Sequence, residues 1–124
     1  MSSYLLRSNL VYVGNASSER SLLITELNSK KIKTLLIEND ISDLNLIDNF
    51  NFVLFGAADK KQVDLVKRIV LLGKIVIVIL SANQKNLANL FIKSGARAIF
   101  VDPVQIEEIT HFVNICNREF ATKR

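Results

Sequence analysis

The sequence predicts a single α/β domain built on a five-stranded parallel sheet with helices on both faces. Five short apolar runs, rich in β-branched residues, alternate along the chain with segments of helical spacing. The runs are nearly continuous rather than alternately apolar and polar, as expected of strands buried on both faces. A chain of 124 residues is long enough for one well-buried core. We therefore expect one domain over residues 1–124, with its core within about residues 8–120.

Each element follows from its local pattern. The predicted strands are residues 10–13, 34–37, 52–55, 75–80 and 98–101. Four helices are indicated by apolar residues three and four positions apart: Leu23, Ile24 and Leu27; Val63, Val66, Ile69 and Val70; Leu87, Leu90 and Phe91; and Ile106, Ile109, Val113, Cys116 and Phe120. A further short helix is expected within residues 39–48, where Ile41, Leu44 and Ile47 share one side among many Asn and Asp residues.

Residues at the predicted helix ends agree with this assignment of strands and helices. Ser17 or Ser18 can cap the first helix, and Asn83 can cap the helix that follows the fourth strand. Gly73 and Gly95 follow helical runs, where a left-handed residue is favoured. Five βα units joined by right-handed crossovers favour the flavodoxin-like strand order 2-1-3-4-5 in three α/β/α layers. In such a sheet, ligands bind at the carboxyl ends of the strands, near the first and third.

Composition limits the classes of function. With 49% hydrophobic and 23% charged residues the chain should fold rather than stay disordered. The net charge of +4 comes from short pairs that we interpret as solvated helix ends: Lys30 and Lys31, Lys60 and Lys61, Lys67 and Arg68, and Lys123 and Arg124. The chain has no Trp and no basic cluster interleaved with aromatic residues, so we do not expect direct nucleic-acid binding by this domain.

The remaining global features predict a cytoplasmic protein. The single Cys116 lies in an apolar helical stripe and is interpreted as a buried hydrophobe, which suits a reducing compartment. No apolar run approaches the roughly 18 residues that span a bilayer, and the N-terminus lacks a secretory signal. We expect no membrane association. Residues 118–124, polar and basic, would suit a linker to a further domain.

Two segments carry a family resemblance. Residues 77–82 form an apolar strand that ends in Ser81-Ala82, and residues 94–103 contain a Gly-Ala turn, a strand and Asp102-Pro103. Together with the order of elements over about residues 8–120, they resemble the CheY-like receiver domain of response regulators in two-component systems. That resemblance implies an acidic pair after the first strand, a phosphoacceptor Asp after the third, a hydroxyl after the fourth and Lys-Pro after the fifth.

The chain departs from the family at these chemical positions. Gly14 and Asn15 replace the acidic pair, Gly56 stands at the phosphoacceptor position, and Asp102 replaces the lysine. Phosphoryl transfer to a carboxylate needs a carboxylate nucleophile, a cation held by oxygen ligands and a positive group near the developing charge. We therefore predict no catalytic residue, metal or cofactor. The predicted degenerate phosphorylation pocket contains Gly14, Asn15, Gly56, Ser81, Asp102 and Pro103. The resemblance implies that the Asp102-Pro103 bond is cis.

Three further residues have two interpretations each, and a fourth, Ile99, has one. Ser81 is either a retained functional hydroxyl or, as we favour, a side chain bonded to backbone at a strand end. Asp59 could reach the pocket, but loop Asp residues are commonly solvated turn formers, which we favour. Ile99 stands at the family's aromatic switch position and lacks the ring that couples to the hydroxyl. His111 has no second metal-type ligand at matching spacing, so we expect it at the surface.

A fold retained without its chemistry still offers a rigid surface. We therefore predict a phosphorylation-independent pseudo-receiver that binds a partner protein or forms a homodimer, either as the N-terminal regulatory domain of a transcriptional regulator or as a free-standing adaptor. The resemblance implies that the interaction face is formed by the fourth helix, fifth strand and fifth helix. Its expected residues are Lys85, Asn89, Ile92, Lys93, Ile99, Val101, Phe112 and Ile115.

Two other classes of function compete with this prediction. A small-molecule sensor would bind a neutral or cationic metabolite in the crevice lined by Gly14, Asn15, Gly56, Ser81 and Asp102. Backbone amides of residues 14–18 could also hold a small anion, although a glycine-rich phosphate loop is missing there. We do not expect an enzyme, because no credible pair of nucleophile and base is present.

Overall fold

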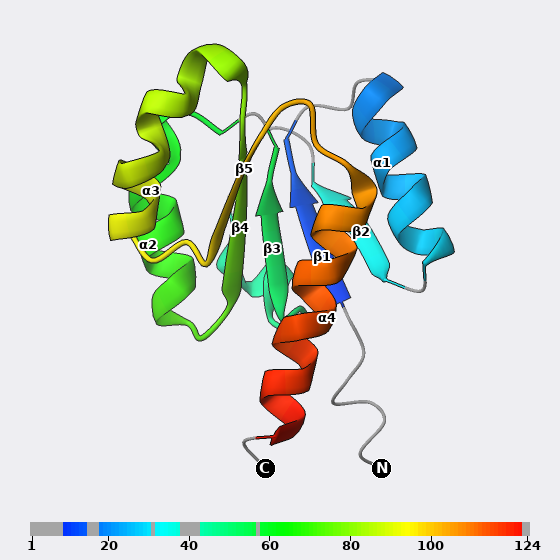
Figure 1. Cartoon of the computed structure of the whole chain (residues 1–124). Coiled ribbons are helices and arrows are strands. Elements are labelled where there is room, and N and C mark those ends of the chain that lie inside the picture. The colour runs from blue at the N-terminus through cyan, green and yellow to red at the C-terminus, as the bar shows by residue number, and fades with distance from the viewer. Residues whose placement is uncertain (1–8, 15–17, 31, 38–42, 57, 123–124) are drawn as a thin grey trace.

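The computed structural model describes residues 9–14, 18–30, 32–37, 43–56 and 58–122 of the chain. They form a five-stranded parallel sheet in the order β2-β1-β3-β4-β5, with helices on both faces (Figure 1). The predicted fold class and strand order are confirmed. The strands are β1 (Asn9–Val13), β2 (Lys33–Ile37), β3 (Phe52–Phe55), β4 (Ile75–Leu80) and β5 (Ala98–Val101).

The helices lie in two layers. The α-helices are α1 (Ser18–Ser29), α2 (Val63–Leu71), α3 (Ala88–Lys93) and α4 (Ile106–Thr122). The part of the chain that the structure describes also contains the 3-10 helices η2 (Leu44–Ile47), η3 (Lys60–Gln62) and η4 (Ala82–Leu87). Figure 1 shows α1 and α4 on one face of the sheet and α2 and α3 on the other. In this order β2 and β5 are the two edge strands.

Successive strand residues serve opposite core layers, because side chains alternate across a sheet. Val53 and Phe55 of β3 pack with the layer that contains Phe91 of α3, whereas Phe52 and Leu54 pack with the layer that contains α1 and α4. Every residue of β3 and β4 is buried. Burial on both faces explains why these strands read as continuous apolar runs.

The two predicted glycine positions end helices as expected. Gly73 and Gly95 have φ values of +86° and +108°, a region that residues with a Cβ rarely adopt. Their amides donate hydrogen bonds to the carbonyl oxygens of Val70 and Ile92, at 2.9 and 3.0 Å. A Cβ built on Gly95 would lie 2.8 Å from Cγ1 of Val70, so the C-terminal ends of α2 and α3 are packed closely together.

One local prediction was confirmed only in part, and one was wrong. The helix expected over residues 39–48 is, within the described residues, the single 3-10 turn η2; residues 38–42 lie outside them. Asp43 caps η2 by accepting a hydrogen bond from the Asn45 amide at 3.0 Å, which favours a short turn. Asn83 does not cap the helix after β4. The N-cap is Ser81, and a 3-10 bond from the Gln84 amide to the Ser81 carbonyl, 2.9 Å long, places Asn83 inside the first turn.

The last helix is long. α4 continues to Thr122, so most of the segment that we expected as a linker is helical in this structure. Residues 123–124 lie outside the described residues, and a further domain stays a prediction. Among the helices described here, none has the length and apolar character that crossing a membrane requires.

Candidate functional site

Backbone hydrogen bonds bring three of the predicted pocket residues to the carboxyl edge of the sheet. The Gly56 amide donates to the Val13 carbonyl at 3.0 Å, and the Asp102 amide donates to the Leu80 carbonyl at 2.9 Å. A Cβ built on Gly14 would lie 3.0 Å from the Gly56 carbonyl oxygen, so the two glycines are direct neighbours. Asn15, another of the residues proposed to line this crevice, lies outside the described residues.

The position at which the resemblance implies a phosphoacceptor is filled from the neighbouring strand. A Cβ built on Gly56 would overlap the phenolic oxygen and Cζ of Tyr12, and would lie 3.1 Å from Tyr12 Cε2. Tyr12 belongs to β1, is 1% exposed and packs in the layer beneath α1 and α4. Its ring therefore uses the space that any side chain at position 56 would need.

Gly14 completes this arrangement from the other side. A Cβ at Gly14 would lie 3.4 Å from Tyr12 Cε1, and its φ of +152° is rarely adopted by residues with a side chain. Both glycines are buried, and the tyrosine ring lies against both. Gly14, Tyr12 and Gly56 thus form one packing unit at the switch between β1 and β3.

The hydroxyl after β4 makes a different contact from the one expected. Ser81 Oγ donates a hydrogen bond to Asn83 Oδ1 at 2.7 Å rather than bonding to backbone. The reason is the tight 3-10 turn that follows Ser81, which brings the side chain of Asn83 within hydrogen-bond distance of the Ser81 hydroxyl. Ser81 is half-buried and Asn83 is exposed. The Ser81 hydroxyl therefore takes part in a local turn.

The segment after β5 agrees with the resemblance in its backbone. The Asp102-Pro103 peptide bond is cis, as the resemblance implies. Asp102 is half-buried, and Pro103 is exposed. A carboxylate side chain stands here, where the resemblance implies a lysine.

Asp59 is engaged in a helix cap. Its side chain accepts a hydrogen bond from the Lys61 amide at 2.8 Å, and the Gln62 side-chain oxygen accepts one from the Asp59 amide at 3.1 Å. These two bonds form a capping box at the start of η3. The interpretation of Asp59 as a turn former is confirmed. In the described part of the chain, no group of three or more His, Cys, Asp or Glu side chains is placed to hold a metal ion.

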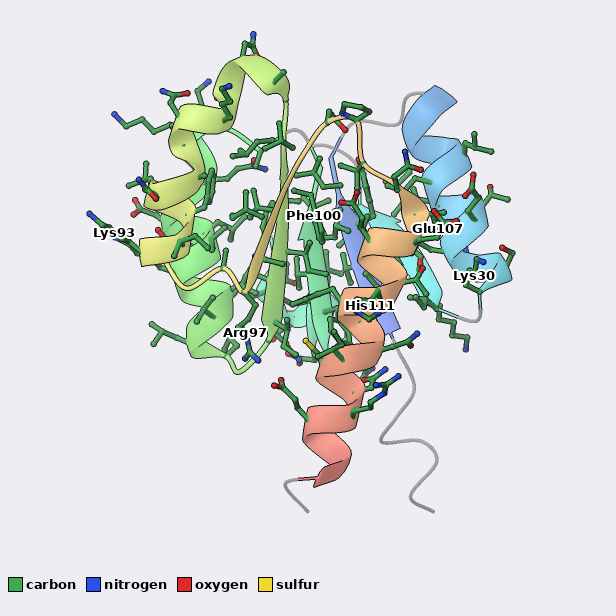
Figure 2. All side chains as sticks on the ribbon, in the orientation of Figure 1. Lys30, Lys93, Arg97, Phe100, Glu107 and His111 are labelled. Carbon is green, nitrogen blue, oxygen red and sulfur yellow. The ribbon has the colours of Figure 1, made fainter. Side chains whose placement is uncertain are left out.

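Two chemically capable side chains lie away from this edge. Cys116 of α4 is 2% exposed, and burial raises the pKa of its thiol above the ordinary value of 9.0. A raised pKa keeps the thiol protonated and unreactive, as expected of a buried hydrophobe. His111 is exposed on α4, one turn from Glu107 (Figure 2), which agrees with the surface position predicted for it.

The residues predicted for the interaction face are distributed over η4, α3, β5 and α4. Six of them are exposed: Lys85, Asn89, Ile92, Lys93, Val101 and Ile115. Ile99 and Phe112 are half-buried and pack against opposite core layers, Ile99 with the α2 and α3 layer and Phe112 with the α1 and α4 layer. We call the eight residues together the α3–β5–α4 face.

Tyr12 was missed because its role depends on a contact between strands. In the sequence it is one apolar residue of a predicted strand, followed two positions later by Gly14. The register pairs Tyr12 with Leu54 of β3, so the tyrosine ring can extend along β1 toward Gly56. A tyrosine two residues before a strand-end glycine was the available signal, but the partner strand was not known from the sequence.

Comparison with solved structures places the fold among receiver domains. A CheY-like receiver domain protein from Methanospirillum hungatei superposes with a TM-score of 0.77 at 16% identity, over 94% of this chain and 98% of that chain. A receiver protein from Pseudomonas putida gives 0.72 at 17% identity, over 88% and 97%. An orphan response regulator of H. pylori gives 0.73 at 18% identity, over 87% and 94%.

No family model matches the sequence, and no curated protein matches it. At identities below one in five residues, the structural likeness shows a common fold. The chain therefore has the fold of a response-regulator receiver domain, with Gly56, packed against Tyr12, at the position where the resemblance implies a phosphoacceptor.

Proposed function

We propose that this chain is a pseudo-receiver: a cytoplasmic, non-enzymatic signalling domain that works without accepting a phosphoryl group and acts by binding a protein. The observation that carries this proposal is the packing of Tyr12 into the space beside Gly56. A carboxylate is missing at that position, and the volume it would need is filled. Phosphorylation of an aspartate at this place would require a different packing of β1 and β3.

The charges at the carboxyl edge support the same proposal. A phosphoryl group bound there would meet the Asp102 carboxylate where receivers have a cation, and like charges repel at short range. Asp59, the nearest acid in the sequence after Gly56, already accepts the Lys61 amide in its capping box. Transfer to a carboxylate needs a nucleophile with free access and positive charge nearby, and these residues supply neither.

The partner would bind through the α3–β5–α4 face. β5 is an edge strand, and apolar side chains beside it are exposed: Ile92 at 50%, Val101 at 39% and Ile115 at 38%. Exposed aliphatic groups around an edge strand are typical of surfaces that associate with a second copy or with another protein. We propose that the domain serves a transcriptional regulator or acts as an adaptor through this face.

The alternative of a metabolite sensor in the crevice has no comparable support. The tyrosine ring packs against Gly14 and Gly56, which line the crevice between β1 and β3. A ligand would have to displace a side chain that is 1% exposed.

The proposal is tested by adding beryllofluoride with Mg²⁺, and separately acetyl phosphate with Mg²⁺, and recording amide NMR spectra. We expect no shift at Gly14, Gly56, Ser81 or Asp102, because no carboxylate at position 56 can bind the phosphoryl analogue. A receiver domain that retains its phosphoacceptor serves as the positive control. Shifts clustered at these four amides of this chain would contradict the proposal.

A further inference from the structure

The basic residues of this chain are concentrated in one part of the sequence. Residues 60–101 contain eight Lys or Arg residues and a single acid, Asp64, whereas the other residues contain eight basic and eleven acidic side chains. Residues 60–101 include η3, α2, η4 and α3, which lie on one side of the sheet, together with the strands β4 and β5 (Figure 1). Residues 60–101 therefore carry a net charge of +7 and the rest of the chain a net charge of −3, which together give +4.

The elements that carry these side chains lie on one side of the sheet. Six of the basic side chains are exposed residues of η3, α2, η4 and α3: Lys60, Lys61, Lys67, Arg68, Lys85 and Lys93. We call them the α2–α3 basic face. Figure 2 shows Lys93 pointing away from the sheet. Within the described residues, none of these six side chains makes an ion pair or a hydrogen bond, in contrast to Arg97, which bonds to Glu119 at 3.0 Å.

Exposed aliphatic residues accompany the cations at the ends of α2 and α3. Leu71 is 85% exposed, and Leu72 and Ile92 are each 50% exposed. The contact between Gly95 and Val70 holds these two helix ends together. Exposed aliphatic side chains next to cations without ion-pair partners do not stabilise a monomer, and such mixed patches are typical of binding surfaces. A partner that offers carboxylates and apolar groups together would satisfy both.

From this charge and apolar pattern we infer that the α2–α3 basic face binds an acidic polypeptide segment of a partner protein that also carries aliphatic side chains. The inference rests on the proposed partner-binding function and adds to it a second face and the chemistry of its ligand. Lys85 and Lys93 belong to both faces, whereas Lys60, Lys61, Lys67 and Arg68 belong to this face alone. Electrostatic complementarity of this kind speeds association and selects acidic partners.

Two other anionic partners fit less well. A bilayer surface takes up the apolar face of an amphipathic helix, but the apolar side of α2, formed by Val63, Val66 and Ile69, is buried in the core. A nucleic acid presents phosphates to cations and bases to aromatic side chains, yet the aromatic ring of α3, Phe91, is 0% exposed. Leu71 would find no apolar counterpart on a phosphate backbone.

The experiment uses a displayed library of random 16-residue peptides as the probe, selected on the full chain at low salt. We expect enrichment of Asp and Glu together with Leu and Ile. Synthetic versions of the selected peptides should bind the double variant K67E/R68E about tenfold or more weakly, because reversal of two central charges replaces attraction with repulsion. The control K30E/K33E makes the same change of net charge on the α1 and β2 side, and should alter affinity about twofold or less.

The contribution of the aliphatic residues is tested with Leu71→Ser, which should lower the affinity for the same peptides by about threefold or more. Leu22→Ser on α1 is the matched control. Circular dichroism confirms that each variant is folded. Selected peptides without acidic enrichment, or equal binding to K67E/R68E and K30E/K33E, would overturn the inference. So would DNA duplexes or phosphatidylserine vesicles that bind through Lys67 and Arg68 more tightly than the peptides do. The beryllofluoride experiment measures amide shifts at the carboxyl edge of the sheet and does not involve the α2–α3 basic face. A failure of this inference is therefore distinguishable from a failure of the proposed function.

Discussion

The phenol of Tyr12 occupies the space in which a side chain at position 56 would have to lie, and a Cβ there would come within 3.1 Å of Tyr12 Cε2 besides overlapping the phenol. Tyr12 lies on β1, and Gly56 directly follows the neighbouring strand β3. The tyrosine ring fits only because position 56 has no side chain. The absence of a side chain at position 56 and the presence of the Tyr12 ring in that space are therefore one structural feature. A carboxylate at position 56 would need changes on both strands.

Gly56→Asp should destabilise the protein strongly. The new side chain overlaps Tyr12, and overpacking costs about 1–3 kcal/mol before the cost of burying a carboxylate is added. Urea unfolding should show a total loss of about 3 kcal/mol or more. Gly73→Asp is the control, because nothing lies within 4 Å of its Cβ position. The left-handed backbone there costs about 1 kcal/mol. Equal losses in the two variants would contradict the packing described for Gly56.

Shortening Tyr12 should partly rescue that substitution. In a double-mutant cycle, Tyr12→Val combined with Gly56→Asp should be less destabilising than the sum of the single changes by about 1 kcal/mol or more. The reason is that valine removes the ring atoms which the aspartate would overlap. Additive free energies of unfolding would show that the two positions do not compete for space.

Asp59→Ala should affect stability and leave the carboxyl edge unchanged. Loss of the capping box removes the acceptor for the Lys61 amide and should lower the free energy of unfolding by about 1 kcal/mol. Asp64→Asn, an exposed acid one turn later, should cost about 0.5 kcal/mol or less. Amide NMR shifts that reach Gly14 and Asp102 after Asp59→Ala would instead place Asp59 in the pocket.

The Cys116 thiol should make stability fall at alkaline pH. Its pKa is raised in the folded state, mainly by burial, with a smaller lowering by Arg97 and a raising by Glu119. The unfolded chain therefore loses the thiol proton first, and the stabilising contribution is complete below about pH 9 and declines as pH rises above it. The free energy of unfolding of the wild type, relative to that of Cys116→Val, should fall as the pH rises above about 9. A difference independent of pH would contradict the raised pKa.

Self-association through the α3–β5–α4 face is tested by sedimentation velocity. If Ile115 contributes to a dimer, the sedimentation coefficient of the wild type should rise with concentration, and Ile115→Glu should abolish the rise. A charge placed at a partly apolar interface must be desolvated, which opposes association. Leu22→Glu on α1, at a side chain 60% exposed, is the control and should still associate. A strict monomer at high concentration would remove dimerisation from the proposal.

Much of the fold was predictable from local patterns. The β4 run Ile75–Leu80 was recognisable because six buried residues in succession leave no polar side chain. Gly73 and Gly95 marked helix ends because a left-handed backbone favours glycine. The failures lie in short polar turns. Asp43 and Asn83 can each make several local hydrogen bonds of similar energy, and the sequence alone did not show which of them forms.

The candidate site was predictable in its residues and unpredictable in its packing. Gly56 was predicted at the phosphoacceptor position because the third strand and the residue after it are adjacent in sequence. Tyr12 was not recognised, because its contact with Gly56 depends on the pairing of β1 with β3. The basic pairs were interpreted as scattered helix ends, since the sequence does not show that α2 and α3 share one side of the sheet.

The sequence by itself determined the strands, the helix-ending glycines and the absence of an acidic side chain at position 56, because backbone preference and apolar periodicity act over neighbouring residues. The tertiary structure alone decided that Tyr12 fills the space at Gly56 and that Lys67, Arg68 and Lys93 lie on one face. Contacts of this kind depend on strand order and register, which are established by residues far apart in the chain.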